Sequence, residues 1–209
     1  MKGIEVEFRF KIEDEEKVKE FLAKLNSIKK IQQKDVYFDT KNGDLFKRGI
    51  FVRLRNDNTL DLKFNLEDKE NKHEDCSEYS FTLPLSDPEK LTRVCKILDL
   101  KSPETVSLEN FLEENNLKEF EIIDKIREKF SDGEFTFCLD DIKGFGKFLE
   151  IESVVSEGTD LDELKKRMIE RVSIFNPKFL PTGYIELFVK EKDFNLYKQG
   201  RYLLEEDKN

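Results

Sequence analysis

Two pairs of glutamates, each separated by one residue, are the first feature of this sequence that can do chemistry. Glu5 and Glu7 lie near the start of the chain, and Glu150 and Glu152 lie late in it. Side chains two residues apart on a β-strand point to the same face, which places the members of each pair about 7 Å apart. Carboxylate oxygens are the ligands that Mg²⁺ and Mn²⁺ prefer. The two pairs, together with Asp140, are therefore candidate metal ligands.

Basic side chains follow the same spacing elsewhere in the chain. Arg53 and Arg55 share one face of a predicted strand, Lys63 follows on the next, and Lys125 and Arg127 share a face of a third. Like charges on one strand face repel each other, so several such groups favour a polyvalent ligand that neutralises them. Arg holds phosphate oxygens with a planar fork of donors, and Lys acts as a point charge. We expect the basic groups to bind phosphates, with a metal bridging phosphate and carboxylates.

The charged residues alternate with apolar residues, which is typical of strands with one apolar and one ionic face. Strands are predicted over residues 4–12, 51–55, 60–66, 134–140 and 148–155, with weaker ones near 31–39, 77–83 and 120–130. Asn58 and Thr59 suit a tight hairpin, and residues 143–146 suit a turn. Helices are predicted over residues 15–25, 87–98, 107–116 and 160–174. Residues 194–209 are polar and favour a short helix or a tail.

About eight strands is close to the number that closes a barrel able to hold one small ligand. In an ordinary two-layer sheet the charged faces would meet water, and this remains the alternative for any single strand. The segregation of acids and bases favours charged faces that point inward and apolar faces that pack under helices. We therefore predict a mainly β (α+β) fold, a closed eight-stranded antiparallel tunnel with several flanking helices. It forms one domain over residues 1–209, with a core over about 3–190.

The composition excludes several classes of protein. The net charge of −9 argues against a general nucleic-acid binder, which would be basic, and the 19 Phe argue against disorder. No apolar run is long enough to cross a membrane, and the first residues do not form a signal peptide. Cys76, Cys95 and Cys138 lack a CxxC spacing, which favours free thiols in a reducing compartment, the cytoplasm. The single His73 excludes a catalytic triad and a His-rich zinc site.

The charged motifs also have a recognisable order. They are Glu5-x-Glu7-x-Arg9, Arg53-x-Arg55, Lys63, Arg127, Asp140 and Glu150-x-Glu152. This ordered set resembles the CYTH superfamily, also called the triphosphate tunnel metalloenzymes, over roughly residues 3–190. The resemblance implies an eight-stranded antiparallel tunnel, a triphosphate substrate and a Mg²⁺ or Mn²⁺ cofactor. Thiamine triphosphatases, inorganic triphosphatases, class IV adenylyl cyclases and RNA triphosphatases belong to that family.

Within the family, the first half of the chain is most similar to thiamine triphosphatases. Residues 37–40, Tyr-Phe-Asp-Thr, resemble the Tyr-Tyr-Asp-Thr of that branch, and residues 51–55 resemble its Trp-x-Arg-x-Arg. The resemblance implies metal ligation by the five acids named above. It also implies that Tyr37 lies near the reacting phosphate, and that the triphosphate is held by Arg53, Arg55, Lys63 and Arg127. Phe51 replaces the tryptophan of that branch and can still stack on an organic cation.

Arg9 departs from the family motif, which ends in Lys. Arg stays protonated, so it can supply charge but cannot act as a base. Lys11 shares the face of Arg9 and is a further candidate for contact with the substrate. The candidate catalytic residues are Arg9, Tyr37 and Lys63.

Four functions fit this sequence. The first is a metal-dependent hydrolase that removes the terminal phosphate of thiamine triphosphate or inorganic triphosphate. The second is a class IV type adenylyl cyclase, which also needs a nucleobase pocket. The third is a non-catalytic binder of triphosphate or polyphosphate, which Arg9 favours. The fourth is a stable β-domain with a charged surface. The expected partner is a small-molecule triphosphate, with no membrane or nucleic acid, and the chain is expected to be a monomer or homodimer.

Overall fold

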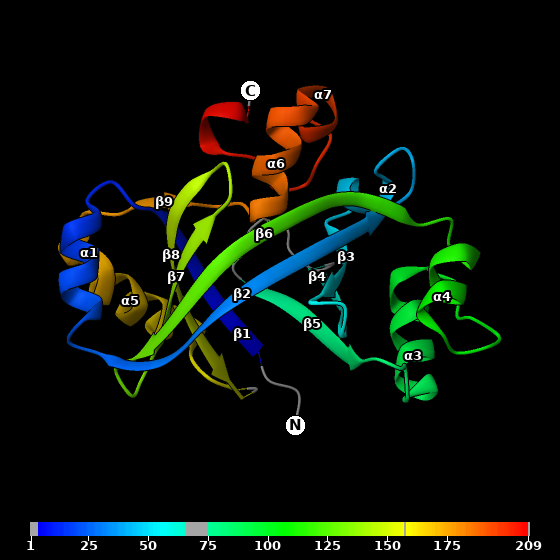
Figure 1. The fold of residues 1–209 in the computed structure, drawn as a ribbon, viewed down its shortest axis with the longest axis horizontal. Helices are drawn as coiled ribbons and strands as arrows, with labels where there is room; N and C mark the ends of the chain where they lie inside the picture. Colours follow the sequence, from blue (N-terminus) through cyan, green and yellow to red (C-terminus); the bar gives the residue numbers. More distant parts are fainter. Residues whose placement is uncertain (1–3, 66–74, 157, 209) are drawn as a thin grey trace.

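The computed structural model describes residues 4–65, 75–156 and 158–208 of the chain. Its strands form one antiparallel sheet that closes on itself (Figure 1). The strands are β1 (Ile4–Lys11), β2 (Asn26–Asp39), β3 (Ile50–Arg55), β4 (Thr59–Phe64), β5 (Asp75–Thr82), β6 (Lys118–Ser131), β7 (Thr136–Ile142), β8 (Gly146–Val155) and β9 (Lys178–Leu180). The order β5-β4-β3-β2-β6-β7-β8-β1 closes through pairing of β1 with β5. The predicted eight-stranded tunnel is therefore confirmed.

Two strands, β5 and β9, pair with different parts of one edge of β1. Glu5 pairs with Cys76 of β5 at one end, and Arg9 pairs with Leu180 of β9 at the other. β8 pairs with β1 along its whole length on the opposite edge, where Arg9 faces Glu150. The acidic pairs that are far apart in sequence are thus brought onto neighbouring strands.

Helices lie around and inside the ring of strands. They are α1 (Glu15–Leu22), α2 (Asp44–Lys47), α3 (Pro88–Leu98), α4 (Leu108–Glu114), α5 (Leu161–Val172), α6 (Tyr184–Lys192) and α7 (Phe194–Tyr197), with 3₁₀ turns at Ser173–Phe175 and Glu205–Asp207. Asp14 caps α1 and Asp87 caps α3, each by accepting a backbone N–H hydrogen bond three residues on. The four predicted helices are present, and α2 and α6 are additions. None of the described helices is long and apolar enough to cross a membrane.

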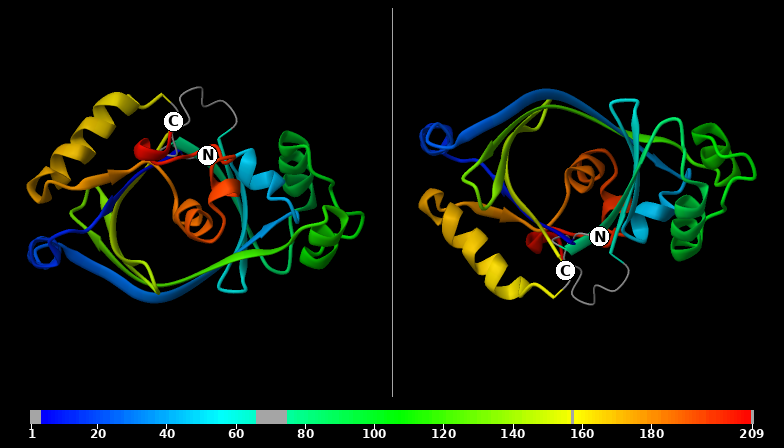
Figure 2. Two further views of the ribbon diagram at one scale, coloured as in Figure 1. Left: turned by 90° about the horizontal axis from the view of Figure 1, so that it is seen from above. Right: turned by 90° about the horizontal axis from the view of Figure 1, so that it is seen from below.

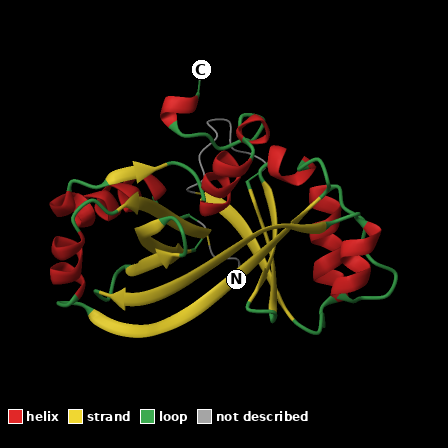
Figure 3. Ribbon diagram, turned by 45° about the horizontal axis from the view of Figure 1, so that its top comes forward, coloured by secondary structure: helices red, strands yellow, loops and turns green. Residues whose placement is uncertain are grey.

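Two apolar cores lie outside the ring, one at each end of the molecule (Figure 3). In one, Val18 of α1 and Met168 of α5 pack on Phe8 and Phe137. In the other, α3 and α4 cover the outer faces of β2 to β5, where Val52, Leu60 and Leu62 are fully buried. Apolar strand faces therefore pack outward under helices, and the charged faces point inward. The water-facing alternative is wrong for the strands that carry the charged motifs.

A third apolar core fills one end of the ring. Viewed along the tunnel, α6 lies within the circle of strands (Figure 2). Its Ile185 and Val189 pack with Tyr197 and Tyr202, both almost completely buried, and with Phe51 of β3. Residues 194–208 are consequently more than a polar tail, because their tyrosines complete this core.

Turns fall where the sequence places them, with small shifts. The β3–β4 hairpin turns over residues 56–58, one position earlier than predicted, because Asn56 and Asp57 adopt the left-handed conformation with φ of 49° and 52°. Gly144 at φ 84° allows the turn between β7 and β8. β2 begins at Asn26, five residues before the predicted start. Leu66 and His73 lie outside the described residues.

Candidate functional site in the tunnel

The ring encloses a cavity of about 100 Å³ with a strongly ionic lining. Its aromatic lining residues are Tyr37, Phe51 and Tyr184. Among the described residues, the basic lining side chains are Arg9, Arg53, Arg55, Lys63, Lys125, Arg127 and Lys129, and the acidic ones are Glu5, Glu7, Asp35, Glu78, Glu150 and Glu152. Acids and bases nearly balance here, although the chain as a whole is acidic. A cavity with low-dielectric walls strengthens the interactions of these charges with a polyvalent ion.

Glu150 is held between two arginines. Its Oε1 accepts a hydrogen bond of 2.6 Å from Nε of Arg9, and its Oε2 accepts one from Arg127. Burial alone would raise the pKa of Glu150, but Arg127 and Arg9 outweigh burial and hold that pKa well below its usual value. Glu150 is therefore a permanent anion at the centre of the tunnel.

Arg9 is fixed from several directions. Its Nη1 donates to the backbone carbonyl of Thr182 at 2.7 Å, and its Nη2 donates to Glu7 at 3.3 Å. The guanidinium lies over the ring of Tyr184, 4.3 Å from the ring centroid. Although burial opposes its charge, Glu150 and Glu7 keep the pKa of Arg9 well above its usual value. Arg9 therefore acts as a fixed positive charge and cannot accept a proton.

Lys63 joins the two glutamates of β1. Its Nζ lies 2.8 Å from Oε1 of Glu7 and 3.8 Å from Oε2 of Glu5. Burial raises the pKa of Glu5 to about 7, against the opposing effect of Lys63, and the charge of Glu7 adds to the rise. The charge of Glu5 therefore changes near neutral pH.

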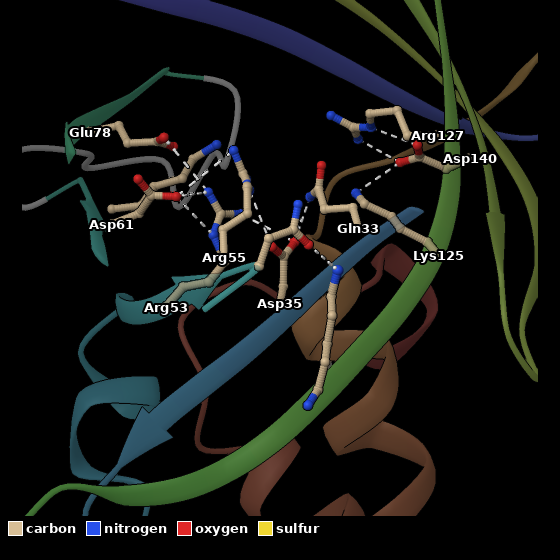
Figure 4. A network of polar contacts seen from close by, with 12 residues as sticks. Gln33, Asp35, Arg53, Arg55, Asp61, Glu78, Lys125, Arg127 and Asp140 are labelled. Atoms are coloured by element: carbon tan, nitrogen blue, oxygen red, sulfur yellow. Dashed lines mark hydrogen bonds and ion pairs between the residues drawn. The ribbon is translucent and has the colours of Figure 1, made fainter. Parts of the chain in front are cut away.

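A second ionic group lies under β2 to β5 (Figure 4). Arg53 donates to Oδ2 of Asp61 at 2.8 Å, and Arg55 donates to Oδ1 of Asp35 at 3.1 Å. Glu78 lies 3.6 Å from Arg53 and adds a third carboxylate beside these guanidinium groups. The buried carboxylates of Asp35 and Asp61 hold both guanidinium groups toward the cavity.

Asp140 anchors the bases of β6 (Figure 4). Its carboxylate accepts hydrogen bonds from Nζ of Lys125 at 3.0 Å and from Nε of Arg127 at 2.6 Å. Asp140 is completely buried and does not line the cavity, so both of its oxygens are engaged behind the lining. Burial and the neighbouring Arg127 lower the pKa of Lys125. Its ammonium also lies 4.8 Å from the ring centroid of Tyr184.

Glu150 and Glu152 form a metal-capable group with Cys138. Each offers one ligand atom, and these atoms lie within 4.8 Å of one another. Burial raises the pKa of the Cys138 thiol, so the thiol stays protonated and the carboxylates are the effective donors. Glu152 also contacts Lys129 at 2.8 Å, which places Lys129 inside the tunnel. An oxygen donor set of this kind fits Mg²⁺ or Mn²⁺.

The structure brings most of the predicted site residues together. The predicted residues that line the cavity are Glu5, Glu7, Arg9, Tyr37, Phe51, Arg53, Arg55, Lys63, Lys125, Arg127, Glu150 and Glu152. Lys11 does not join them, because β1 passes the end of the tunnel and its side chain is exposed there. Burial raises the pKa of Tyr37, so its hydroxyl stays protonated.

Three functional positions were missed from the sequence. Asp35 and Asp61 stand two residues before Tyr37 and Lys63, so strand alternation alone would have placed them on the inner face. Tyr184 comes from α6, which was not predicted, and no signal in the strand pattern points to it. Glu186 follows on the same helix. It is almost completely buried, neither carboxylate oxygen has a hydrogen-bond partner among the described residues, and burial raises its pKa to about 7.

Comparison with known proteins decides the family. The model of the CYTH domain matches residues 3–184, which cover all of the described strands and the first residue of α6. The chain belongs to the CYTH family. Members of this family typically act on triphosphates and generally use divalent metal ions. A curated relative from Methanocaldococcus jannaschii, named "Putative adenylate cyclase", is 26% identical to this CYTH protein over 191 residues, which are 88% of the chain and 98% of the relative.

Solved structures share the fold. A Pyrococcus horikoshii protein superposes with a TM-score of 0.61 at 21% identity, covering 90% of this chain and 99% of that one. A Hippeastrum protein, described as a "putative adenylyl cyclase" that reveals a dominant triphosphatase activity, superposes with a TM-score of 0.54 at 16% identity. It covers 91% of this chain and 95% of that one. At these identities the likeness shows the CYTH fold alone.

Proposed function

We propose that this CYTH protein is a metal-dependent triphosphatase that hydrolyses the terminal phosphate of inorganic triphosphate or thiamine triphosphate. The observation that carries the proposal is the pairing of the tunnel bases with the tunnel acids. Arg53, Lys63 and Arg127 each contact a carboxylate at hydrogen-bond distance inside a closed ring. A triphosphate carries about four negative charges near neutral pH, enough to engage several of these bases at once.

Glu5, Glu7, Glu150 and Glu152 would hold the metal ion. Mg²⁺ or Mn²⁺ bound there would neutralise phosphate charge and polarise a water molecule. Glu150 is ionised at all ordinary pH values, because Arg127 and Arg9 keep its pKa well below the usual range. Asp140, predicted as a ligand, is better suited to positioning Lys125 and Arg127, since it is completely buried behind these two residues and, unlike Glu150, does not line the cavity.

The remaining residues bind and orient the substrate. Arg53 and Arg55 present guanidinium groups that Asp61 and Asp35 keep pointed into the cavity. Arg127 and Lys125 line the cavity from β6, where Asp140 holds them. Tyr37 can donate a hydrogen bond from its protonated hydroxyl. Arg9 supplies charge only. The proton of the attacking water must therefore go to a group other than Arg9.

The shape of the cavity favours a compact substrate. Its volume of about 100 Å³ leaves little space beyond the charged groups, and α6 fills the end that adjoins Phe51. Phe51 lines the cavity beside Tyr202, with ring centroids 6.2 Å apart. The small volume and the position of α6 favour inorganic triphosphate over a nucleotide. Binding of thiamine triphosphate would require Phe51 to stack on the thiazolium cation.

An adenylyl cyclase is the second candidate. The M. jannaschii relative is named "Putative adenylate cyclase", and the Hippeastrum protein, a "putative adenylyl cyclase", is described with a dominant triphosphatase activity. The products distinguish the two functions, since a cyclase releases pyrophosphate and cyclic AMP from ATP. A non-catalytic triphosphate binder remains the third candidate, because Arg9 stands where the family motif has Lys.

Variants of the two outer glutamates test the proposal. Glu5→Gln combined with Glu152→Gln should lower Mg²⁺-dependent phosphate release from inorganic triphosphate by at least a hundredfold. Neither residue is clamped between two arginines as Glu150 is, so the double variant should still fold. Glu119→Gln, an exposed change on β6, is the matched control. Wild-type turnover by the double variant would contradict the metal-site assignment, and triphosphate binding without turnover in the parent protein would favour the binder.

A further inference from the structure

A second and larger cavity lies beyond the end of the charged tunnel. It has a volume of about 540 Å³ and is bounded by β9, the β7–β8 turn, α6 and the segment after α7. Apolar side chains form most of its surface, among them Phe145, Phe179, Leu187 and Phe194. Phe194 is half exposed, although it is a large aromatic residue. Cavities of this size and character commonly hold small molecules.

Two lysines mark one side of this cavity. Lys11 of β1 and Lys178 of β9 are direct partners in the strand register, and both side chains are exposed. Within the described part of the chain neither has an ion-pair partner, whereas Lys190 is paired with Asp207 at 2.5 Å. Like charges directly opposite each other on antiparallel strands are unfavourable. An anionic group bound between Lys11 and Lys178 would remove that repulsion.

Acidic residues line the cavity from other elements. They are Glu191 of α6 and Glu205 and Glu206 near the C-terminus. They would repel an anion placed near the helix. The charge distribution therefore orients a ligand with its anionic group at β1 and β9 and its apolar part against the aromatic side chains.

Two side chains in direct contact connect this cavity with the tunnel. Phe148 lines the second cavity and Tyr184 lines the tunnel, and their rings meet edge to face with centroids 5.2 Å apart. Pro181 also lines the second cavity, next to Thr182, whose carbonyl accepts the hydrogen bond from Arg9. An occupant of the second cavity would thus contact residues that adjoin Tyr184 and Thr182, two of the groups that hold Arg9.

We infer that the second cavity binds an amphipathic anion, an apolar chain or ring that carries one carboxylate or phosphate, and that its occupancy changes the affinity of the tunnel for triphosphate. The binding step is independent of the proposed hydrolase activity. The coupling step rests on triphosphate binding in the tunnel, which is part of the proposed function. Coupling between two sites is reciprocal, so it can be measured from either ligand.

Calorimetry on the full chain with octanoate, octyltrimethylammonium and octanol tests the binding step. We expect octanoate to bind with one site per chain, and at least tenfold more tightly than the cationic and neutral probes. Lys178→Glu should weaken octanoate binding at least tenfold, and Phe194→Ala should weaken it as well. Lys166→Glu, an exposed change on α5, is the matched control and should leave it unchanged. Equal binding of the three probes, no binding of octanoate, or full binding by Lys178→Glu would overturn the inference.

A second titration tests the coupling step. The affinity for inorganic triphosphate with Mg²⁺ is measured with and without saturating octanoate, and we expect it to change at least threefold. Lys178→Glu should bind triphosphate normally but lose the effect of octanoate. Unchanged triphosphate affinity with octanoate bound would overturn the coupling. Failure of triphosphate to bind at all would instead contradict the proposed function and leave the octanoate result standing by itself.

Discussion

The guanidinium of Arg9 lies 4.3 Å from the ring centroid of Tyr184, which joins the first strand of the chain to a helix 175 residues later. The same guanidinium reaches Glu150 and the carbonyl of Thr182. β1, β8 and the start of α6 therefore meet at one cation. This arrangement gives Arg9 a fixed place in the tunnel, and it leads to the first prediction.

Arg9→Lys should keep turnover within about tenfold of the parent protein, whereas Arg9→Met should lose at least a hundredfold. Arg9 supplies charge, and Lys retains that charge. The Lys variant cannot reproduce all three contacts, and leaving the buried Thr182 carbonyl unpaired should cost about 1–3 kcal/mol of stability. Steady-state kinetics and urea unfolding measure the two effects. A large gain in turnover by Arg9→Lys would instead show that a base is needed at this position.

The affinity for Mn²⁺ should rise as pH increases from 6 to 8. Burial raises the pKa of Glu5 to about 7, so below that pH a proton competes with the metal. The affinity should fall by up to about tenfold for each pH unit below 7, because one proton is displaced. Calorimetric titration of Mn²⁺ at several pH values measures this slope. Glu5→Gln should make the Mn²⁺ affinity nearly independent of pH. An unchanged pH dependence in that variant would show that the competing proton binds to another group.

Asp140→Asn should destabilise the protein by about 3–5 kcal/mol, because it leaves Lys125 and Arg127 as buried cations without their carboxylate. The neighbouring Asp141 is exposed and provides a matched control. Asp141→Asn should change stability by less than about 0.5 kcal/mol, as surface substitutions usually do. Urea unfolding compares the two variants. Equal midpoints would mean that the Asp140 network does not stabilise the tunnel.

Glu186→Gln should stabilise the protein at pH 8 by on the order of 1–3 kcal/mol. Burial raises the pKa of Glu186 in the folded state to about 7, from an ordinary value of 4.5. The stability that this group contributes is therefore fully present below pH 4.5 and is lost as pH rises through 7. Glu191→Gln, an exposed change on the same helix, is the control. Unfolding midpoints of the variant and the parent protein are compared at pH 5 and pH 8. An equal gain in stability at both pH values would show that the gain does not come from ionisation of Glu186.

The alternation of charged and apolar residues was enough to predict the tunnel. Each inward charged set, such as Glu5 and Glu7, follows from the two-residue period of a strand. The two-residue period does not show where a strand extends beyond the tunnel. For this reason Lys11 was predicted to lie with Arg9, although it lines the second cavity. Nor does the period show pairing across strands, so the engagement of Asp140 by Lys125 and Arg127 could not be foreseen.

Helix α6 could not be predicted for a physical reason. Sequence patterns reveal a helix best when one face is apolar and the other meets water. The first part of α6 is buried on several sides, at Tyr184, Ile185, Glu186, Phe188 and Val189, so no single apolar face stands out. Gly183 begins the helix without a side-chain hydrogen bond, which removes the usual capping signal. For this reason Tyr184, whose ring lies against Arg9, could not be identified from the sequence.

Phosphorus NMR of the purified protein with Mg²⁺ and, separately, inorganic triphosphate, thiamine triphosphate and ATP tests the central claim most directly. We predict orthophosphate release from inorganic triphosphate or thiamine triphosphate, abolished by chelation of the metal and by Glu5→Gln combined with Glu152→Gln. Pyrophosphate and cyclic AMP from ATP, with no orthophosphate from the other two, would contradict the hydrolase and establish a cyclase in the same tunnel.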